Sequence, residues 1–249
     1  MNNALLTVRE LFSSIQGEGY LAGRRQIFIR LAECNLDCRY CDTDFVRNGI
    51  CRMEESPGSG LFVDGAGEMT PVDLLERVRR WNGLLPGAHH SISLTGGEPL
   101  LQADLLAALL PDLGRVLPLH LETNGTLPEA LQQLVDHLDY ISMDIKLPST
   151  SGCGDLWFVH HRFLEIAQLR NTSVKVIVSE ATPDEEIRQV AGLITAVDRT
   201  TPLFLQPMTA RGGGVAIPSV RLMRLQELAS SLLPDVRVIP QMHLMLGAL

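Results

Sequence analysis

Short runs of apolar and β-branched residues alternate with segments of helical periodicity along most of this chain. Such runs are typical of buried strands, whereas a 3.6-residue period indicates helices that cover a sheet. Because a helix follows each strand, we expect parallel strands joined by right-handed crossovers. The predicted strands are 26–31, 91–95, 119–122, 140–144, 174–178 and 203–206, and the predicted helices are 71–81, 102–110, 128–137, 156–169, 183–197 and 219–232.

Six strand–helix repeats are fewer than the eight that close a full barrel. The predicted fold class is therefore α/β, with an open, partial (βα)6 barrel of the TIM type, although a doubly wound sheet fits the same pattern almost as well. No linker divides the chain, so we expect one domain, 1–249. Residues rich in Gly, Ser, Glu and Asp interrupt the alternation and predict a surface insertion at 47–69.

Composition excludes several classes of function. Apolar residues make up 45% of the 249 positions, enough for a sizeable core, but no apolar run approaches the length of a membrane span. The first residues do not resemble a secretory signal, so a soluble, cytoplasmic protein without membrane contact is expected. The net charge is −8 and no basic block stands out, so nucleic acid is not an expected partner.

Three of the five cysteines form a C-x3-C-x2-C run at Cys34, Cys38 and Cys41. This spacing can hold three irons of a cubane cluster and leave the fourth iron open to a small molecule, whereas electron-transfer clusters normally use four thiolates. A structural zinc site would need a further Cys or His pair, and neither His89–His90 nor His160–His161 has that spacing. The spacing favours an iron–sulfur cluster; zinc and buried thiols are the alternatives.

A glycine-rich turn, Thr95–Pro99, directly follows the predicted strand 91–95. Glycines expose backbone groups, and in such barrels ligands bind where the strands end. The cysteine run, with the aromatic Tyr40 before its last cysteine, and the Gly-Gly-Glu-Pro turn together resemble the radical S-adenosylmethionine (SAM) superfamily. The resemblance implies a 4Fe-4S cluster whose open iron binds SAM, one-electron cleavage of SAM to a 5′-deoxyadenosyl radical, and a full or partial barrel.

Within that superfamily, three segments and the C-terminal 238–243 resemble the 7-carboxy-7-deazaguanine synthase family. The three segments are Ile15–Gly19, Phe28–Leu31 and Cys41–Thr43. The resemblance implies a carbon–nitrogen lyase of queuosine-type 7-deazapurine biosynthesis. It would convert 6-carboxy-5,6,7,8-tetrahydropterin to 7-carboxy-7-deazaguanine with loss of ammonia, using Mg²⁺.

The resemblance also implies roles for single residues. Cys34, Cys38 and Cys41 would hold the cluster, and the hydroxyl of Thr43 would bind Mg²⁺. The residues expected to contact substrate are Ile15, Gln16, Gly17, Arg30 and Thr95, of which Arg30 can grip a carboxylate bidentately. The residues expected to contact SAM are Tyr40, Asp42, Gly97, Glu122, Asp144, Ile145, Lys146 and Gln206.

Some positions depart from the family pattern or have no role in it. Glu33 stands before the first cluster cysteine where the family commonly has glycine, and its carboxylate would affect the cluster unless the side chain turns away. Cys51 and Cys153 have no family role and are expected to be buried or idle thiols. Glu18 and His243 are candidate proton shuttles.

Partners follow from the resemblance as well: an electron donor such as flavodoxin or ferredoxin, and a second copy of the chain in a homodimer. Two other functions fit parts of the pattern. A glycyl-radical-enzyme activating protein would share the cysteine run and the glycine turn, and a non-catalytic iron–sulfur or zinc-binding module would share the cysteines alone.

Overall fold

The computed structural model describes residues 5–41, 43, 46, 48–210 and 213–248. Its strands form an eleven-stranded sheet in the order β11-β10-β9-β8-β7-β6-β2-β1-β3-β4, and β5 pairs with β1 outside that row. The strands are β1 (Leu6–Ile15), β2 (Arg25–Leu31), β3 (Ile50–Glu54), β4 (Phe62–Ala66), β5 (Glu68–Met69), β6 (Ser91–Gly96), β7 (Leu119–Thr123), β8 (Tyr140–Asp144), β9 (Asn171–Val178), β10 (Leu203–Pro207) and β11 (Val236–Val238).

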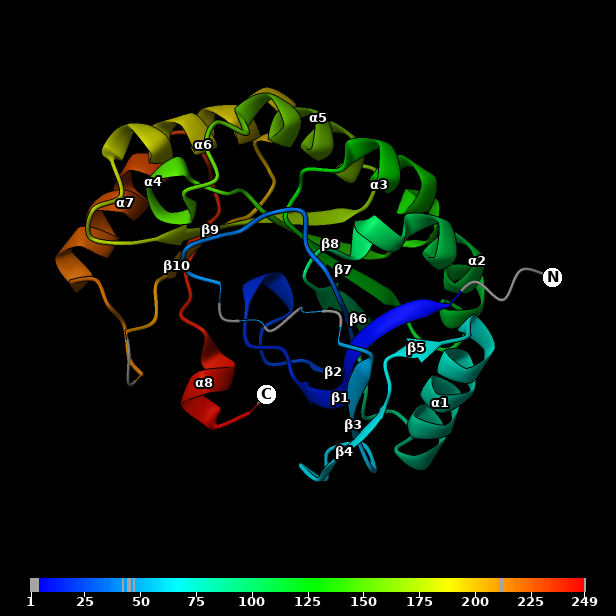
Figure 1. Cartoon of the computed structure of the whole chain (residues 1–249). Helices are drawn as coiled ribbons and strands as arrows, with labels where there is room; N and C mark the ends of the chain where they lie inside the picture. Colours follow the sequence, from blue (N-terminus) through cyan, green and yellow to red (C-terminus); the bar gives the residue numbers. More distant parts are fainter. Residues whose placement is uncertain (1–4, 42, 44–45, 47, 211–212, 249) are drawn as a thin grey trace.

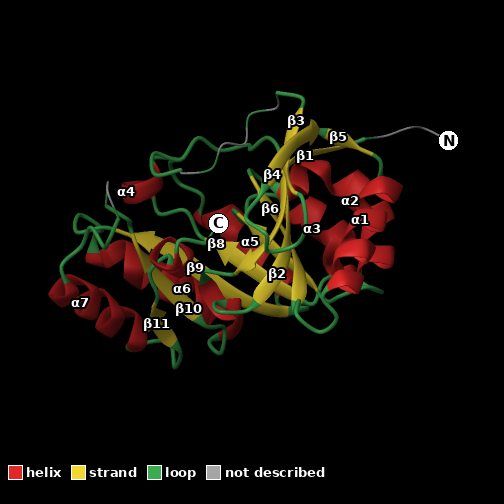
Figure 2. Ribbon diagram, turned by 90° about the horizontal axis from the view of Figure 1, so that it is seen from below, coloured by secondary structure: helices red, strands yellow, loops and turns green. Residues whose placement is uncertain are grey.

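The larger helices lie along the outer side of the curved sheet, and Figure 1 shows them as an arc. The turned view of Figure 2 shows α1 and α2 at one end of this curve and α7 at the other. The helices are α1 (Pro71–Leu84), α2 (Ala103–Leu113), α3 (Pro128–Leu134), α4 (Pro148–Ser151), α5 (Trp157–Ala167), α6 (Asp184–Asp198), α7 (Ser219–Ser230) and α8 (Met242–Leu246), with 3-10 turns η1 (Gly19–Leu21), η2 (Pro99–Gln102) and η3 (Val135–His137).

The six predicted strands and six predicted helices are confirmed, with their ends shifted by a few residues. Strands β2, β6, β7, β8, β9, β10 and β11 are parallel neighbours. Over the described residues, the row ends at β4 and β11 and these two do not pair, so the barrel is open. Helices along one side of such a sheet agree with the predicted partial (βα)6 barrel rather than with a doubly wound sheet.

Strand β1 is not predicted by the sequence, although it lies between β2 and β3, antiparallel to β2 and parallel to β3. Its pairing register shifts between Val8 and Glu10. A bulge of this kind breaks the period-two alternation of buried and exposed side chains that identifies a strand in a sequence.

The segment predicted as a surface insertion at 47–69 extends the sheet. Strand β3 pairs parallel with β1, and β4 pairs antiparallel with β3. The side chain of Cys51 is buried in the core, and burial raises its pKa to about 12, in agreement with a buried, inert thiol. The buried carboxylate of Glu54 accepts hydrogen bonds from the backbone amides of Ser13, Gly58 and Gly60 at 2.7–2.9 Å, which fixes the β3–β4 turn against β1.

The core lies between the sheet and the outer helices, and α1 shows how the sequence builds it. The hydroxyl of Thr70 caps the helix by accepting a hydrogen bond from the Asp73 amide at 3.1 Å. The buried side chains Leu74, Val78 and Trp81 recur at helical spacing on the face toward the sheet. Burying a side chain of this size stabilises the fold by about 1.5–3 kcal/mol. Among the described residues, no helix is both long and apolar enough to span a membrane.

Candidate active site

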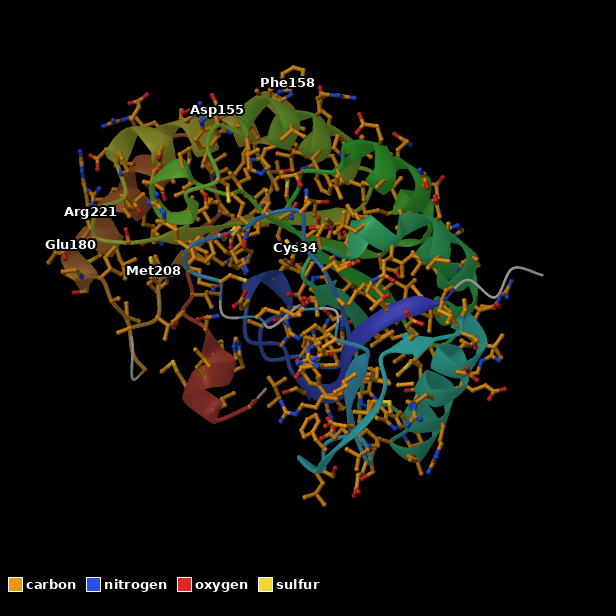
Figure 3. The ribbon with its side chains drawn as sticks, viewed as in Figure 1. Cys34, Asp155, Phe158, Glu180, Met208 and Arg221 are labelled. Atoms are coloured by element: carbon orange, nitrogen blue, oxygen red, sulfur yellow. The ribbon has the colours of Figure 1, made fainter. Side chains whose placement is uncertain are left out.

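A cavity of about 780 Å³ opens on the concave side of the sheet, at the carboxyl ends of the parallel strands. Its walls include Arg30 of β2, Thr95 of β6, Glu122 of β7, Asp144 of β8 and Gln206 of β10, each near the end of its strand. Figure 3 shows Cys34 inside the arc of helices, with Phe158 and Asp155 on its outer side. In barrels of parallel strands this edge carries the active site, because the strand ends and following loops converge there.

The cysteine loop and the glycine turn lie against each other at this cavity. The amide of Gly97 donates to the carbonyl of Leu31 at 3.2 Å, and the amide of Glu98 donates to the carbonyl of Glu33 at 2.8 Å. A Cβ atom on Gly97 would lie 1.9 Å from the Glu33 carbonyl oxygen and 3.0 Å from the Cβ of Cys34. Any side chain at Gly97 would therefore push the turn away from the first cysteine.

Glu98 ties the same turn to the end of β7. Its buried carboxyl accepts hydrogen bonds from the amide of Leu100 at 3.1 Å, the hydroxyl of Thr123 at 2.9 Å and the amide of Asn124 at 2.7 Å. Burial raises the pKa of Glu98 to about 7, and these hydrogen bonds limit the rise. The side-chain amide of Asn124 is thereby held 3.9 Å from the sulfur of Cys34.

The three cysteines fit a cubane cluster. Cys34, Cys38 and Cys41 all line the cavity, and the amide of Leu36 donates to the sulfur of Cys34 at 3.5 Å. Donors to such sulfurs stabilise a cluster's negative charge. Within the described part of the chain, no three His, Cys, Asp or Glu side chains lie close enough to hold one metal ion. A cubane does not need such a group, because each cysteine binds a different iron.

Polar atoms with no partner point to a missing ligand on the cavity wall. The hydroxyl of Tyr40, Oδ1 of Asp144 and Oε1 of Gln206 are buried and have no hydrogen-bond partner among the described residues. Buried polar groups are almost always paired, so an orphan of this kind indicates an absent binding partner. The ammonium of Lys146 lies 2.8 Å from Oδ2 of Asp144 and 5.3 Å from the centre of the Tyr40 ring.

A chain of charges crosses the cavity floor. The ammonium of Lys175 forms an ion pair with Glu18 and lies 3.4 Å from Oδ2 of Asp144. Oε1 of Glu18 also accepts from the side-chain amides of Gln206 at 3.0 Å and Gln241 at 2.9 Å. Burial alone would raise the pKa of Glu18, but the Lys175 charge and these hydrogen bonds outweigh it and lower the pKa to about 2. Glu18 is therefore an ionised carboxylate at neutral pH, which makes it a poor proton donor.

The side chain of Gln16 forms hydrogen bonds within the protein. Its amide nitrogen donates to Oε1 of Gln26 at 3.0 Å and to Oε1 of Glu122 at 2.9 Å, and its amide oxygen accepts from the Glu18 backbone at 3.0 Å. Glu122 also accepts from the hydroxyl of Ser93 at 2.5 Å. The side chain of Gln16 thus orients Glu18 and Glu122, and both of its ends are already engaged.

Arg30 and Thr43 lie next to each other in the lining of the same cavity. Nη1 of Arg30 lies 3.4 Å from the hydroxyl oxygen of Thr43, and Nε of Arg30 lies 2.8 Å from Oε2 of Glu10. Glu10 also lies 3.3 Å from Arg52, so two cations flank it. The structure therefore brings together the residues predicted for the substrate carboxylate and for Mg²⁺, and it directs the Nε edge of Arg30 toward Glu10.

Most predicted site residues line this one cavity. They are Ile15, Gln16, Gly17, Arg30 and Thr95 from the substrate set, Tyr40, Gly97, Glu122, Asp144, Lys146 and Gln206 from the SAM set, the three cysteines, and Thr43. Asp42 lies outside the described residues.

Ile145 does not line the cavity. Its side chain is fully buried in the core, and its backbone amide donates to the carbonyl of Lys175 at 2.9 Å. Successive side chains at a strand point to opposite faces, so Asp144 and Lys146 face the cavity and Ile145 faces the helices. Unlike Asp144 and Lys146, Ile145 therefore does not present its side chain to a ligand in the cavity.

The side chain of Glu33 lies at the protein surface, outside the cavity. Among the described residues, Glu33 is the only non-glycine with a positive φ, 70°. That is the conformation glycine adopts without strain, which explains the glycine expected at this position.

Three further residues contribute contacts to the site that the sequence analysis did not predict. Lys175 could have been found from the sequence, since it is a charged residue in the middle of a buried apolar strand. His243 of α8 packs against Gly17, where an added Cβ would lie 2.1 Å from its Nδ1. Cys153 lies beside Cys38, with 3.5 Å between the sulfurs. Their spacing along the chain carries no signal for these last two contacts.

Comparison with known proteins identifies the chain. The model of the radical SAM superfamily matches residues 29–192. A 7-carboxy-7-deazaguanine synthase of Geobacter sulfurreducens is 47% identical over 97% of both chains. This chain belongs to the 7-carboxy-7-deazaguanine synthase family. The relative in Methanothermobacter thermautotrophicus with the same name is 39% identical over 96% of both chains. The predicted family is confirmed, and neither alternative function is supported.

Solved structures agree with the fold. The crystal structure of QueE from Escherichia coli superposes with a TM-score of 0.60 at 22% identity, covering 96% of this chain and 95% of the other. A radical SAM methyltransferase from Sphaerobacter thermophilus reaches 0.58 at 13% identity, covering 87% and 66%. In this chain the cysteine loop lies on an open barrel. Membership of the radical SAM superfamily implies a 4Fe-4S cluster and SAM.

Proposed function

We propose that this cavity converts 6-carboxy-5,6,7,8-tetrahydropterin to 7-carboxy-7-deazaguanine with loss of ammonia, using Mg²⁺ besides the cluster and SAM. The observation that carries the proposal is the meeting of Arg30 with Thr43 on a wall that also carries the cysteine loop. A guanidinium suits the substrate carboxylate, and a hydroxyl oxygen suits Mg²⁺. When bound, the reduced cluster and SAM supply the radical that abstracts hydrogen from C6 of the pterin.

The wall around Tyr40 is the proposed SAM half. Its unpartnered atoms on Tyr40, Asp144 and Gln206 offer one donor and two acceptors to an amino acid and a ribose, and Lys146 offers a cation. Gly97 keeps the turn close to Cys34, which lets backbone groups reach a ligand of the open iron. Glu122, held by Gln16 and Ser93, lies next to this half and to the substrate half.

The substrate half consists of Arg30, Thr43, Thr95 and the segment Ile15–Gly17. Glu10 lies at the Nε edge of Arg30, so the carboxylate would bind through the two terminal nitrogens of the guanidinium. Thr43 supplies a single protein oxygen, so substrate oxygens and water complete the octahedron around Mg²⁺.

The protein's contribution is positioning, charge and exclusion of water, since the difficult step belongs to the cofactors. Glu18 and Lys175 keep a matched pair of charges at the cavity floor, and the depressed pKa of Glu18 argues for orientation rather than proton donation. His243, packed on Gly17, is the candidate shuttle that the geometry leaves beside the substrate half.

The proposal includes partners and organisation that follow from the family. They are a flavodoxin- or ferredoxin-type electron donor, a homodimer, a single domain over 1–249 and a cytoplasmic location. Free cysteines suit a reducing compartment.

The test is turnover by the anaerobically reconstituted protein. The enzyme is incubated with carboxytetrahydropterin, SAM, a reductant and Mg²⁺, and 5′-deoxyadenosine and the deazaguanine product are quantified. Substrate and product differ only by ammonia, so the hydrogen taken by the 5′-deoxyadenosyl radical must return in each turnover. We therefore expect the deazaguanine product in excess over 5′-deoxyadenosine, and a lower rate without Mg²⁺. SAM cleavage that ignores the pterin, or that requires a partner polypeptide, would refute the proposal.

A further inference from the structure

The thiols of Cys38 and Cys153 form a contact that the reaction does not use. Their sulfurs lie 3.5 Å apart although 115 residues separate them along the chain. Cys153 belongs to the loop between α4 and α5, and nothing in the proposed reaction needs it. We propose that Cys38 and Cys153 are an oxidative cross-link site of the cluster-free protein. A small disulfide such as oxidised glutathione would join them and so withdraw Cys38 from cluster assembly.

The two thiols are held together by backbone contacts next to them. The amide of Arg39 donates to the carbonyl of Ser151 at 3.0 Å, and the amide of Cys153 donates to the hydroxyl of Ser151 at 3.1 Å. Gly152, with a φ of 76°, lies against the Arg39 side chain, and a Cβ there would be 2.7 Å from Nε. The cluster loop and the 151–153 loop are therefore docked, which keeps the sulfurs in contact before any cluster is present.

The other cysteines lack such a neighbour. The sulfur of Cys34 is approached by the amides of Leu36 and Asn124, and that of Cys41 lies 3.9 Å from the carbonyl of Thr43. Cys51 is buried in the core. Among the described residues, which include all five cysteines, no other pair of sulfurs is within hydrogen-bond distance. The geometry thus selects one partner for Cys38.

The chemistry balances without a further reactant. One protein thiolate attacks oxidised glutathione and releases one reduced glutathione, giving a mixed disulfide. The second protein thiolate then displaces the other glutathione, so two protein thiols become one disulfide and two reduced glutathione molecules form. The sulfurs must close to about 2 Å, a small movement for two loop residues. Iron bound to the Cys38 sulfur prevents the exchange, so the cluster and the cross-link exclude each other.

The first experiment maps the cross-link in the full-length protein after the cluster is removed. The protein is equilibrated anaerobically in glutathione buffers of increasing oxidised fraction, quenched and alkylated. Cleavage before Asp37 and after Arg39 separates Cys38 from Cys34 and Cys41. We expect the Cys38–Cys153 peptide to appear at the lowest oxidised fraction, with Cys51 still alkylated. Cross-links among Cys34, Cys38 and Cys41 that leave Cys153 free would overturn the proposal, as would five reduced cysteines in fully oxidised buffer.

The second experiment measures the consequence, with Cys153→Ser as the matched variant because serine keeps the size of the side chain. The oxidised wild-type protein should take up no iron until dithiothreitol is added, and its Cys38 should carry no glutathione. In oxidised Cys153→Ser, Cys38 should be found by mass spectrometry either as a free thiol that still allows iron loading or as a glutathione mixed disulfide. Wild-type protein whose Cys38 carries glutathione while Cys153 stays free would contradict the Cys38–Cys153 pairing. The consequence rests on the proposed cluster role of Cys38. A mapped cross-link with unimpaired iron loading would therefore refute that role, while turnover of the reduced enzyme tests the proposed reaction separately.

Discussion

Replacing Glu18 by Gln removes the anionic half of the Glu18–Lys175 pair. The pKa of Glu18 falls from its ordinary value of 4.5 to about 2 in the folded protein. At 1.36 kcal/mol per pH unit, this difference corresponds to about 3 kcal/mol of stabilisation at neutral pH. In the variant, Lys175 would still have Asp144 as an anion at 3.4 Å. The loss of stability caused by Glu18→Gln should therefore stay at about 3 kcal/mol.

The assay is urea unfolding of Glu18→Gln and wild type at several pH values. Because the folded-state pKa lies below the unfolded-state value, the Glu18 contribution is complete above about pH 4.5 and is lost as the pH falls toward 2. Wild type should therefore be about 3 kcal/mol more stable than the variant at pH 7, and the gap should narrow in acid. Glu185→Gln, at an exposed pair with Arg188, is the matched control and should change stability very little.

A double-mutant cycle with Lys175→Met separates the pair from its surroundings. If the two charges stabilise each other, the double variant should lose less stability than the sum of the two single variants. Additive losses, or a stability gap between wild type and Glu18→Gln that is the same at pH 7 and pH 3, would refute the argument from the ion pair.

Four other substitutions test the site. Thr43→Ala should abolish Mg²⁺ stimulation of turnover while uncoupled SAM cleavage continues; undiminished Mg²⁺ dependence would remove Thr43 as the ligand. Arg30→Lys loses the planar fork, so the KM for the pterin should rise about tenfold or more while SAM affinity is unchanged, as titration calorimetry can check. Gly97→Ala should reduce iron content after reconstitution, because its Cβ meets the Glu33 carbonyl. Glu33→Gly relieves the positive φ and should raise the free energy of unfolding in urea by up to about 1 kcal/mol. A lower free energy of unfolding would contradict a strained backbone at Glu33.

The repeats of the barrel were predictable because they depend on local periodicity. The parallel strands are short, largely apolar runs, and the outer helices show an apolar stripe. Strand β1 was missed because a bulge at Val8–Glu10 disrupts its alternation. Strands β3 and β4 lie within the predicted insertion 47–69 and at the edge of the sheet, where charged and polar residues are common, so their composition does not identify them as strands.

The sequence by itself determined the fold class and the chemistry at the cysteine loop, because Cys34, Cys38 and Cys41 lie within one short segment whose spacing is independent of the rest of the chain. Which distant groups meet at the cavity depends on the tertiary structure. Lys175 pairs with Glu18, and Cys153 reaches Cys38. Such contacts depend on strand order and loop docking, and they leave no periodic trace in the sequence because their partners are more than a hundred residues apart.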